Sequence, residues 1–118
     1  MKSAAKLFPR VSLIFLLALC GLLISAKIAA QSTYGAIVGR VTDASGAIIP
    51  GAKVEALNQA TEAMRNAATN SAGEFRFLNV DPGQYTITVT AAQFAKYEDK
   101  NVVVLARETT RSDISLSV

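Results

Sequence analysis

Apolar and polar residues alternate in short runs over most of the chain after residue 35. Phe75 and Phe77 alternate with charged residues, and Tyr85, Ile87 and Val89 alternate with threonines. This period of two is typical of a β-strand with one buried face. The same alternation, or a short run of β-branched residues, predicts strands at 36–42, 53–58, 74–78, 84–91, 97–105 and 110–118.

Clusters of turn-forming residues separate these segments, among them Pro50-Gly51, Asn70–Gly73 and Asp81-Pro82-Gly83. Gly39 is different because it lies inside the first predicted strand, where a glycine marks a bulge or a close approach of two backbone segments. Short strands at roughly 8–12-residue spacing predict an all-β fold. We therefore expect an antiparallel β-sandwich of about seven strands.

Residues 59–69 have two interpretations. Leu57, Ala60, Met64 and Ala67 lie at helical spacing, which favours a short helix. A helix of about ten residues is marginal in water, however, and strands are predicted on both sides. We favour a hairpin turn followed by a strand near 65–69, which would supply the seventh strand.

The first thirty residues have another pattern. Lys2, Lys6 and Arg10 precede an apolar run from Val11 to Ile24, and small residues follow up to position 30. This order predicts a helical secretory signal peptide over residues 1–30. The fourteen-residue run is shorter than the roughly 20 residues that a membrane-spanning helix needs.

Cleavage of this signal is expected after Ala30, followed by a lead-in at residues 31–35 and the β-sandwich domain at 36–118. An uncleaved N-terminal anchor is the alternative. Lipid attachment at Cys20 is disfavoured because Leu19 occupies a position where a small residue is expected. The chain is therefore expected to be exported to the periplasm, the outer membrane surface or the extracellular space.

Composition changes once residues 1–30 are set aside. Four of the 12 basic residues and none of the 9 acidic residues lie there, which leaves 8 basic and 9 acidic residues and a net charge of −1. No nucleic-acid partner is therefore expected. The remainder has no His, Cys or Trp, which disfavours zinc sites and His- or Cys-based nucleophilic catalysis. We expect no enzyme, no cofactor and no metal.

The turns and strands together resemble a known family. The matching positions are Gly39-Arg40-Val41-Thr42-Asp43, Gly46, Pro50-Gly51-Ala52, Asn70–Gly73, Phe75, Phe77, Pro82-Gly83, Tyr85 and Phe94. In these positions residues 36–118 resemble the carboxypeptidase regulatory-like domain, a transthyretin-like (prealbumin-like) sandwich also grouped with starch-binding-like folds. Three positions depart from that family: Glu62, Gln93 and the turn at 106–108 lack its usual glycines. We expect Gln93 to be forced toward positive φ.

The resemblance implies a fold and not a reaction. We expect a non-catalytic interaction or accessory module whose partner is a protein or a glycan at the cell envelope. The related domain precedes the plug and barrel of TonB-dependent outer-membrane receptors, so a severed N-terminal extension of such a receptor is one alternative. The membrane would then be reached only through the signal peptide or a receptor barrel.

Carbohydrate binding is the other alternative. Its candidate contacts are Tyr34, Phe94 and Tyr97, because sugars stack on exposed aromatic rings. Phe75, Phe77 and Tyr85 are expected in the core instead. The Thr86, Thr88 and Thr90 stripe is expected to be a solvated strand face rather than a binding surface.

Overall fold

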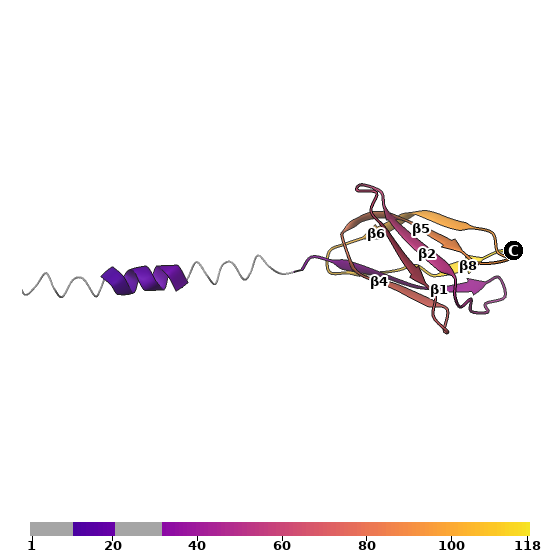
Figure 1. Ribbon diagram of the computed structural model, residues 1–118, viewed down its shortest axis with the longest axis horizontal. Coiled ribbons are helices and arrows are strands. Elements are labelled where there is room, and N and C mark those ends of the chain that lie inside the picture. The colour runs from indigo at the N-terminus through magenta and orange to yellow at the C-terminus, as the bar shows by residue number, and fades with distance from the viewer. Residues whose placement is uncertain (1–10, 21–31) are drawn as a thin grey trace, which may run out of the picture. The chain divides into compact units, whose positions relative to one another are not determined.

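The computed structural model describes residues 11–20 and 32–118 (Figure 1). Residues 11–20 are helical and lie within the predicted signal peptide, whereas the predicted cleavage point after Ala30 lies outside the described residues. No helix in these two ranges is long and apolar enough to cross a membrane. The rest of the described chain, from Thr33 to Val118, is a separate compact unit.

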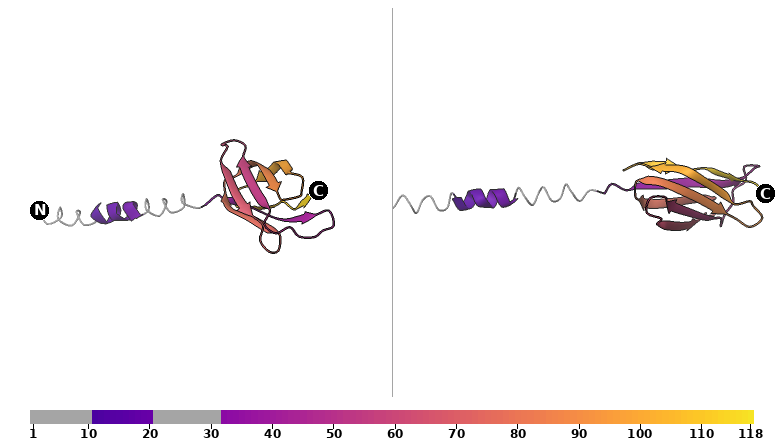
Figure 2. Two further views of the ribbon diagram at one scale, coloured as in Figure 1. Left: turned by 45° about the vertical axis from the view of Figure 1, so that its right-hand side comes forward. Right: turned by 90° about the horizontal axis from the view of Figure 1, so that it is seen from above.

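That unit is built from eight strands. They are β1 (Gly35–Asp43), β2 (Lys53–Asn58), β3 (Met64–Ala68), β4 (Glu74–Val80), β5 (Gly83–Thr90), β6 (Tyr97–Val104), β7 (Thr109–Arg111) and β8 (Ile114–Leu116). One sheet has the order β4-β1-β7, with β8 also paired to β1, and the other has the order β3-β2-β5-β6. The two sheets stack as layers (Figures 1 and 2), which confirms the predicted all-β sandwich.

The end of the chain departs from the prediction in two ways. The single strand expected at 110–118 is divided into β7 and β8, so there are eight strands instead of about seven. Both pieces run parallel to β1, whereas the other paired strands are antiparallel. Ile114 and Leu116 alternate with polar residues in the same way for either direction, so alternation cannot reveal the direction of pairing.

Residues 59–69 form the favoured hairpin, and the alternative helix is wrong. β2 and β3 pair from Lys53↔Ala68 to Leu57↔Met64. Asn58 closes the turn between them, because its side-chain Oδ1 accepts the N–H groups of Ala60 and Thr61 at 3.0 and 3.2 Å. A side chain that bonds to its own following backbone stabilises a turn at the expense of a helix.

The core lies between the two sheets. Phe75 and Phe77 of β4 and Tyr85 of β5 are at most 4% exposed, as predicted. The Tyr85 hydroxyl donates to the Asp81 carbonyl at 2.7 Å and accepts from the Asn58 amide at 3.2 Å, so its polar end is satisfied. The core residues of the described chain all lie between Ile37 and Leu116. Residues 33–118 therefore contain a complete core and can fold without the N-terminal segment.

Four residues other than glycine in the described part of the chain have positive φ. Gln93, expected to do so, has φ of 71°, and the two other positions without the family's glycine are occupied by Glu62 at 61° and Arg107 at 60°. Asn79, at 54°, was not expected, although asparagine tolerates this region better than most residues. A Cβ in the left-handed region costs roughly 1–2 kcal/mol per residue.

Replacing Gln93 with glycine is expected to stabilise the domain by about 1 kcal/mol, because the strain is relieved and the exposed side chain contributes little packing. Chemical denaturation of residues 33–118 would show the change as a higher midpoint. The matched control is Gln93→Ala, which keeps a Cβ and should give no gain. A glycine variant less stable than the alanine variant would contradict the expectation.

Candidate functional site

The outward side of the β4-β1-β7 sheet carries a cluster of charged side chains. Val38 of β1 is paired with Arg76 of β4 on one side and with Arg111 of β7 on the other, and Arg40 is paired with Glu74 in the next row. Residues that are directly opposite on adjacent strands point to the same side of a sheet. We define the arginine face by its six residues: Val38, Arg40, Glu74, Arg76, Arg111 and Asp113.

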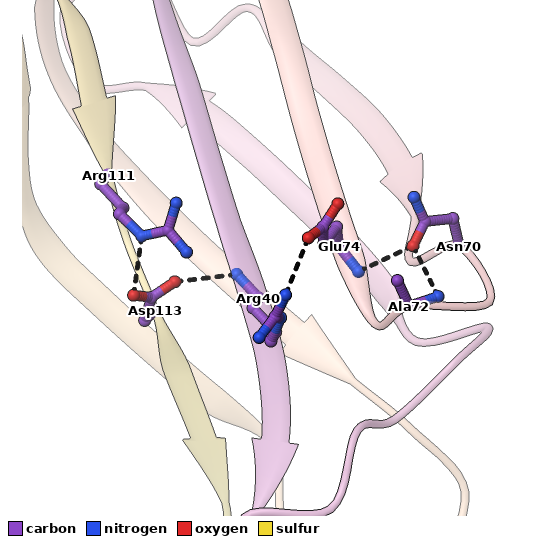
Figure 3. A network of polar contacts seen from close by, with 6 residues as sticks. All are labelled: Arg40, Asn70, Ala72, Glu74, Arg111 and Asp113. Carbon is purple, nitrogen blue, oxygen red and sulfur yellow. Dashed lines mark hydrogen bonds and ion pairs between the residues drawn. The ribbon is translucent and has the colours of Figure 1, made fainter.

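Ion pairs tie most of this face together (Figure 3). Arg40 Nη2 donates to Glu74 Oε1 at 2.9 Å, and the Arg40 backbone N–H donates to Asp113 Oδ1 at 3.0 Å. Arg111 Nε donates to the second Asp113 oxygen at 2.9 Å. This hydrogen bond from Arg111 holds the pKa of Asp113 below its usual value and raises the pKa of Arg111. Asp113 thereby orients Arg111 while both of its own oxygens are occupied.

Arg76 is the exception on this face. Its side chain has no hydrogen bond or ion pair within residues 32–118, although Arg40 and Arg111 each bind a carboxylate. Three arginines against Glu74 and Asp113 leave the arginine face with one uncompensated positive charge. Such a charge is well placed to attract an anionic ligand.

The face is hollowed next to Arg76. A depression of about 490 Å³ is lined by Val38, Arg76 and Arg111, by Asn70 of the β3–β4 connection, and by the adjoining strand ends with Glu74, Ala67 and Ala68. Its volume is in the range of roughly 300–1,000 Å³ typical of small-ligand sites.

The free edge of β4 beside the depression is capped at both ends. Asn70 Oδ1 accepts the Glu74 N–H at 3.0 Å, and the Asn70 N–H donates to the Glu74 carbonyl at 2.9 Å. Further along the strand, Arg65 Nη1 donates to the Leu78 carbonyl at 2.6 Å. Between these caps the peptide group of Arg76 faces that edge, because alternate residues present their backbone groups to the same side. A partner strand therefore cannot be added there without breaking these bonds.

The structure does not bring the three predicted aromatic contacts together. Tyr34 immediately precedes the first residue of β1 and lines a depression of about 260 Å³ with Leu78 and Arg107. The Phe94 loop lies at the other end of β1, because Ala95 N–H donates to the Ser117 carbonyl next to the Leu116↔Asp43 pair. Nine residues of β1 at about 3.3 Å each separate the two ends by roughly 30 Å.

Phe94 and Tyr97 remain neighbours near that second end. Both are partly buried and pack against the core. Tyr97 also lines a depression of about 280 Å³ together with Asp99, Arg111 and Asp113. A single sugar unit can therefore contact Tyr97 or Tyr34, but not both.

The threonine stripe of β5 is less solvated than expected. Thr86 is 9% exposed and Thr88 is half-buried, whereas Thr90 is exposed. Gln59 explains this, because its Nε2 donates to Thr86 Oγ1 at 3.2 Å and to the Lys100 carbonyl at 2.6 Å. The side chain of the β2–β3 turn thus covers part of the stripe.

The charges of this domain show no metal-binding arrangement. In residues 11–20 and 32–118, no group of three or more Asp, Glu, His or Cys side chains is close enough together to hold a metal ion. The carboxylates of Glu74 and Asp113 are already paired with arginines. With its carboxylates paired in this way, the arginine face is suited to binding an anion.

Acidification tests the role of Asp113. Because its folded-state pKa is lowered, its contribution to stability is present above the unfolded value of about 3.9 and is lost as pH falls through the folded value. The free energy of unfolding should therefore fall between pH 5 and 2 by slightly more in the unmodified domain than in Asp113→Asn. The difference is expected to be below about 1 kcal/mol, because the pair is exposed.

Urea denaturation at a series of pH values measures this difference. Asp81→Asn is the matched control for the loss of one exposed carboxylate, since the Asp81 carboxylate has no hydrogen bond or ion pair within residues 32–118. Identical pH dependences for Asp113→Asn and the unmodified domain would show that the observed ion pair does not contribute.

Sequence reasoning missed the arginine face. The alternation of Arg76 with Phe75 and Phe77 does indicate that Arg76 points outward. Arg111, however, lies in the segment that was expected to form one antiparallel strand, and nothing in its local pattern predicts that it lies beside Val38. Its position depends on the parallel pairing of β7 with β1.

Comparison with known proteins supports the fold. A model of the family described as the carboxypeptidase regulatory-like domain matches residues 36–117. A comparison with curated proteins found no match. Solved structures with the same fold include hydroxyquinol 1,2-dioxygenase from Pseudomonas putida, at 9% identity and a TM-score of 0.60 over 75% of this chain and 58% of that one.

Two other similar structures are a catechol 1,2-dioxygenase from Acinetobacter radioresistens and a proposed carbohydrate-binding protein from Bacteroides uniformis. The first is 14% identical with a TM-score of 0.59, covering 75% of this chain and 53% of the enzyme. The second is 18% identical with a TM-score of 0.59, covering 73% of this chain and 42% of that protein. This chain thus spans less than two thirds of each, and at these identities the likeness concerns the fold alone.

Proposed function

The chain belongs to the carboxypeptidase regulatory-like domain family, and on that premise we propose that it is a non-catalytic β-sandwich module that binds a partner at the cell envelope. The observation that carries the proposal is the arginine face, an open surface with a depression of about 490 Å³ and one arginine without a carboxylate partner. Charged groups held in place by ion pairs suit recognition.

Export is part of the proposal. Its support is the order of a basic start, an apolar stretch that is helical at residues 11–20, and then a separate domain with its own core. The test is to express the full chain in a bacterium with two membranes and to fractionate the cells. The expected result is a periplasmic or surface-located product whose mass corresponds to a chain beginning at Gln31. An intact chain found in the cytoplasm would contradict it.

Glycan binding is the second candidate, favoured by the likeness to the proposed carbohydrate-binding protein. For a neutral sugar, the aromatic end with Phe94 and Tyr97 is the surface to test. A glycan array probed with residues 33–118 should show binding that Tyr97→Ala weakens. Tyr34→Ala, at the opposite end of β1, is the control. An array without signal above background would exclude this role for neutral sugars.

A further inference from the structure

Two guanidinium groups flank the floor of the depression on the arginine face. Arg76 and Arg111 are paired with Val38 from opposite sides, so their Cα atoms lie about 10 Å apart, twice the spacing of adjacent strands. Arg76 has its whole guanidinium available. Arg111 uses Nε for Asp113, and its two terminal nitrogens have no partner within residues 32–118. Each arginine can therefore donate two parallel N–H hydrogen bonds to one carboxylate.

The rim of the same depression offers groups that suit hydroxyls. Glu74 Oε1 accepts from Arg40, while its second oxygen has no partner in the described domain. Asn70 uses its side-chain oxygen for two backbone N–H groups at 2.9 and 3.0 Å, which leaves its amide nitrogen as a donor (Figure 3). The two guanidinium groups, which can bind carboxylates, thus lie beside an amide donor and a carboxylate acceptor, which can bind hydroxyl groups.

The surroundings decide between classes of ligand. A peptide that adds to a sheet does so along a free strand edge, and Asn70 and Arg65 cap the β4 edge next to this depression. A neutral sugar would need an exposed aromatic ring, but Phe75, the aromatic residue that lines the depression, is 4% exposed. A sugar that carries carboxylates needs neither feature.

We propose that the arginine face binds a carboxylate-bearing glycan, a chain of uronic acid units, with Arg76 and Arg111 holding carboxylates over Val38. The inference names the ligand class and the site of the envelope-binding function proposed above, and it rests on that function. Binding is electrostatic in origin, so it weakens as salt concentration rises. Asn70 and Glu74 contribute contacts to the sugar hydroxyls at the rim.

The experiment is a calorimetric titration of residues 33–118 at low salt with short oligogalacturonate and oligomannuronate. Methyl-esterified oligogalacturonate is the neutral probe of the same shape, and oligoglutamate is the acidic peptide probe. We expect binding to at least one uronate, with affinity at least about tenfold weaker for the ester and for the peptide. Arg76→Gln and Arg111→Gln should each weaken uronate binding about tenfold.

Arg107→Gln is the matched control, because Arg107 lines the depression near Tyr34 and should not affect binding. Circular dichroism of each variant would confirm that the fold is retained. The proposal is overturned if neither uronate binds, if the ester binds equally well, or if Arg76→Gln binds like the unmodified domain. Equal binding of oligoglutamate would also overturn it, in favour of an acidic peptide site. None of these outcomes changes the fractionation result, which tests the export part of the proposed function separately.

Discussion

Gly39→Ala is expected to cost about 3 kcal/mol or more of the free energy of unfolding, enough to leave much of the domain unfolded at elevated temperature. A Cβ at this position would lie 1.9 Å from the Ser112 carbonyl oxygen and 2.7 Å from two carbons of the Phe75 ring. The Ser112 backbone cannot retreat easily, because its N–H donates to the Val38 carbonyl at 2.8 Å. The Phe75 ring is enclosed in the close-packed core.

Equilibrium denaturation of residues 33–118 measures the effect of Gly39→Ala. The matched control is Gly46→Ala, because Gly46 has φ of +87° but no atom within 4 Å of its added Cβ. The control should therefore lose only the roughly 1–2 kcal/mol of left-handed strain. If Gly39→Ala proved no more harmful than Gly46→Ala, the close packing of β1 against the β7–β8 connection would be wrong.

Phe77→Ala is the second large effect, with an expected loss of about 3–5 kcal/mol. Phe77 is 2% exposed, and its ring centroid lies 6.1 Å from that of Phe75. The Arg65 guanidinium carbon lies 5.8 Å from the centroid of the Phe77 ring, so the substitution also removes a cation–π contact. Removing the ring leaves a cavity between the sheets that the surrounding strands can close only in part.

Thermal unfolding should show a correspondingly large shift, since each kcal/mol moves the midpoint of a domain of this size by about 4–8 °C. Phe77→Leu should lose clearly less, because it keeps most of the buried volume. Leu78→Ala is the neighbouring control: Leu78 is 51% exposed and should cost below about 1 kcal/mol. A similar loss for Phe77→Ala and Leu78→Ala would mean that Phe77 is not a core residue.

Gly39→Ala and Phe77→Ala test the core of the domain and not the proposed binding site. Phe77 and Gly39 act on the inward side of β1 and β4, whereas Val38 and Arg76 stand on the outward side of the same strands. Variants of Arg76 and Arg111 should therefore change ligand affinity with little change in stability, because both side chains are exposed. The likeness of fold to the dioxygenases likewise does not imply their reaction, because function depends on the side chains that a scaffold presents.

Local patterns of the sequence were sufficient for much of the fold. The alternation around Phe75 and Phe77 correctly predicted both a strand and the side of it that is buried. The missing family glycine at Gln93 correctly predicted positive φ. Gly39 within a strand predicted a bulge or a close backbone approach, and the structure shows the close approach. Each of these properties belongs to a few consecutive residues, so a few consecutive residues can reveal it.

Patterns along the chain were enough to place most of the strands and turns and to tell which side chains of the central strands point inward, because the period of two is a property of each strand alone. The packed structure was needed to show that β7 runs parallel to β1 and places Arg111 beside Val38, and that Tyr34 and Tyr97 lie at different ends of the sandwich. Strand pairing joins residues more than seventy positions apart, and the entropy of closing such long loops varies only slowly with length. The strand with which β7 pairs therefore depends on how the whole core packs. The arrangement of the arginine face depends on the same packing.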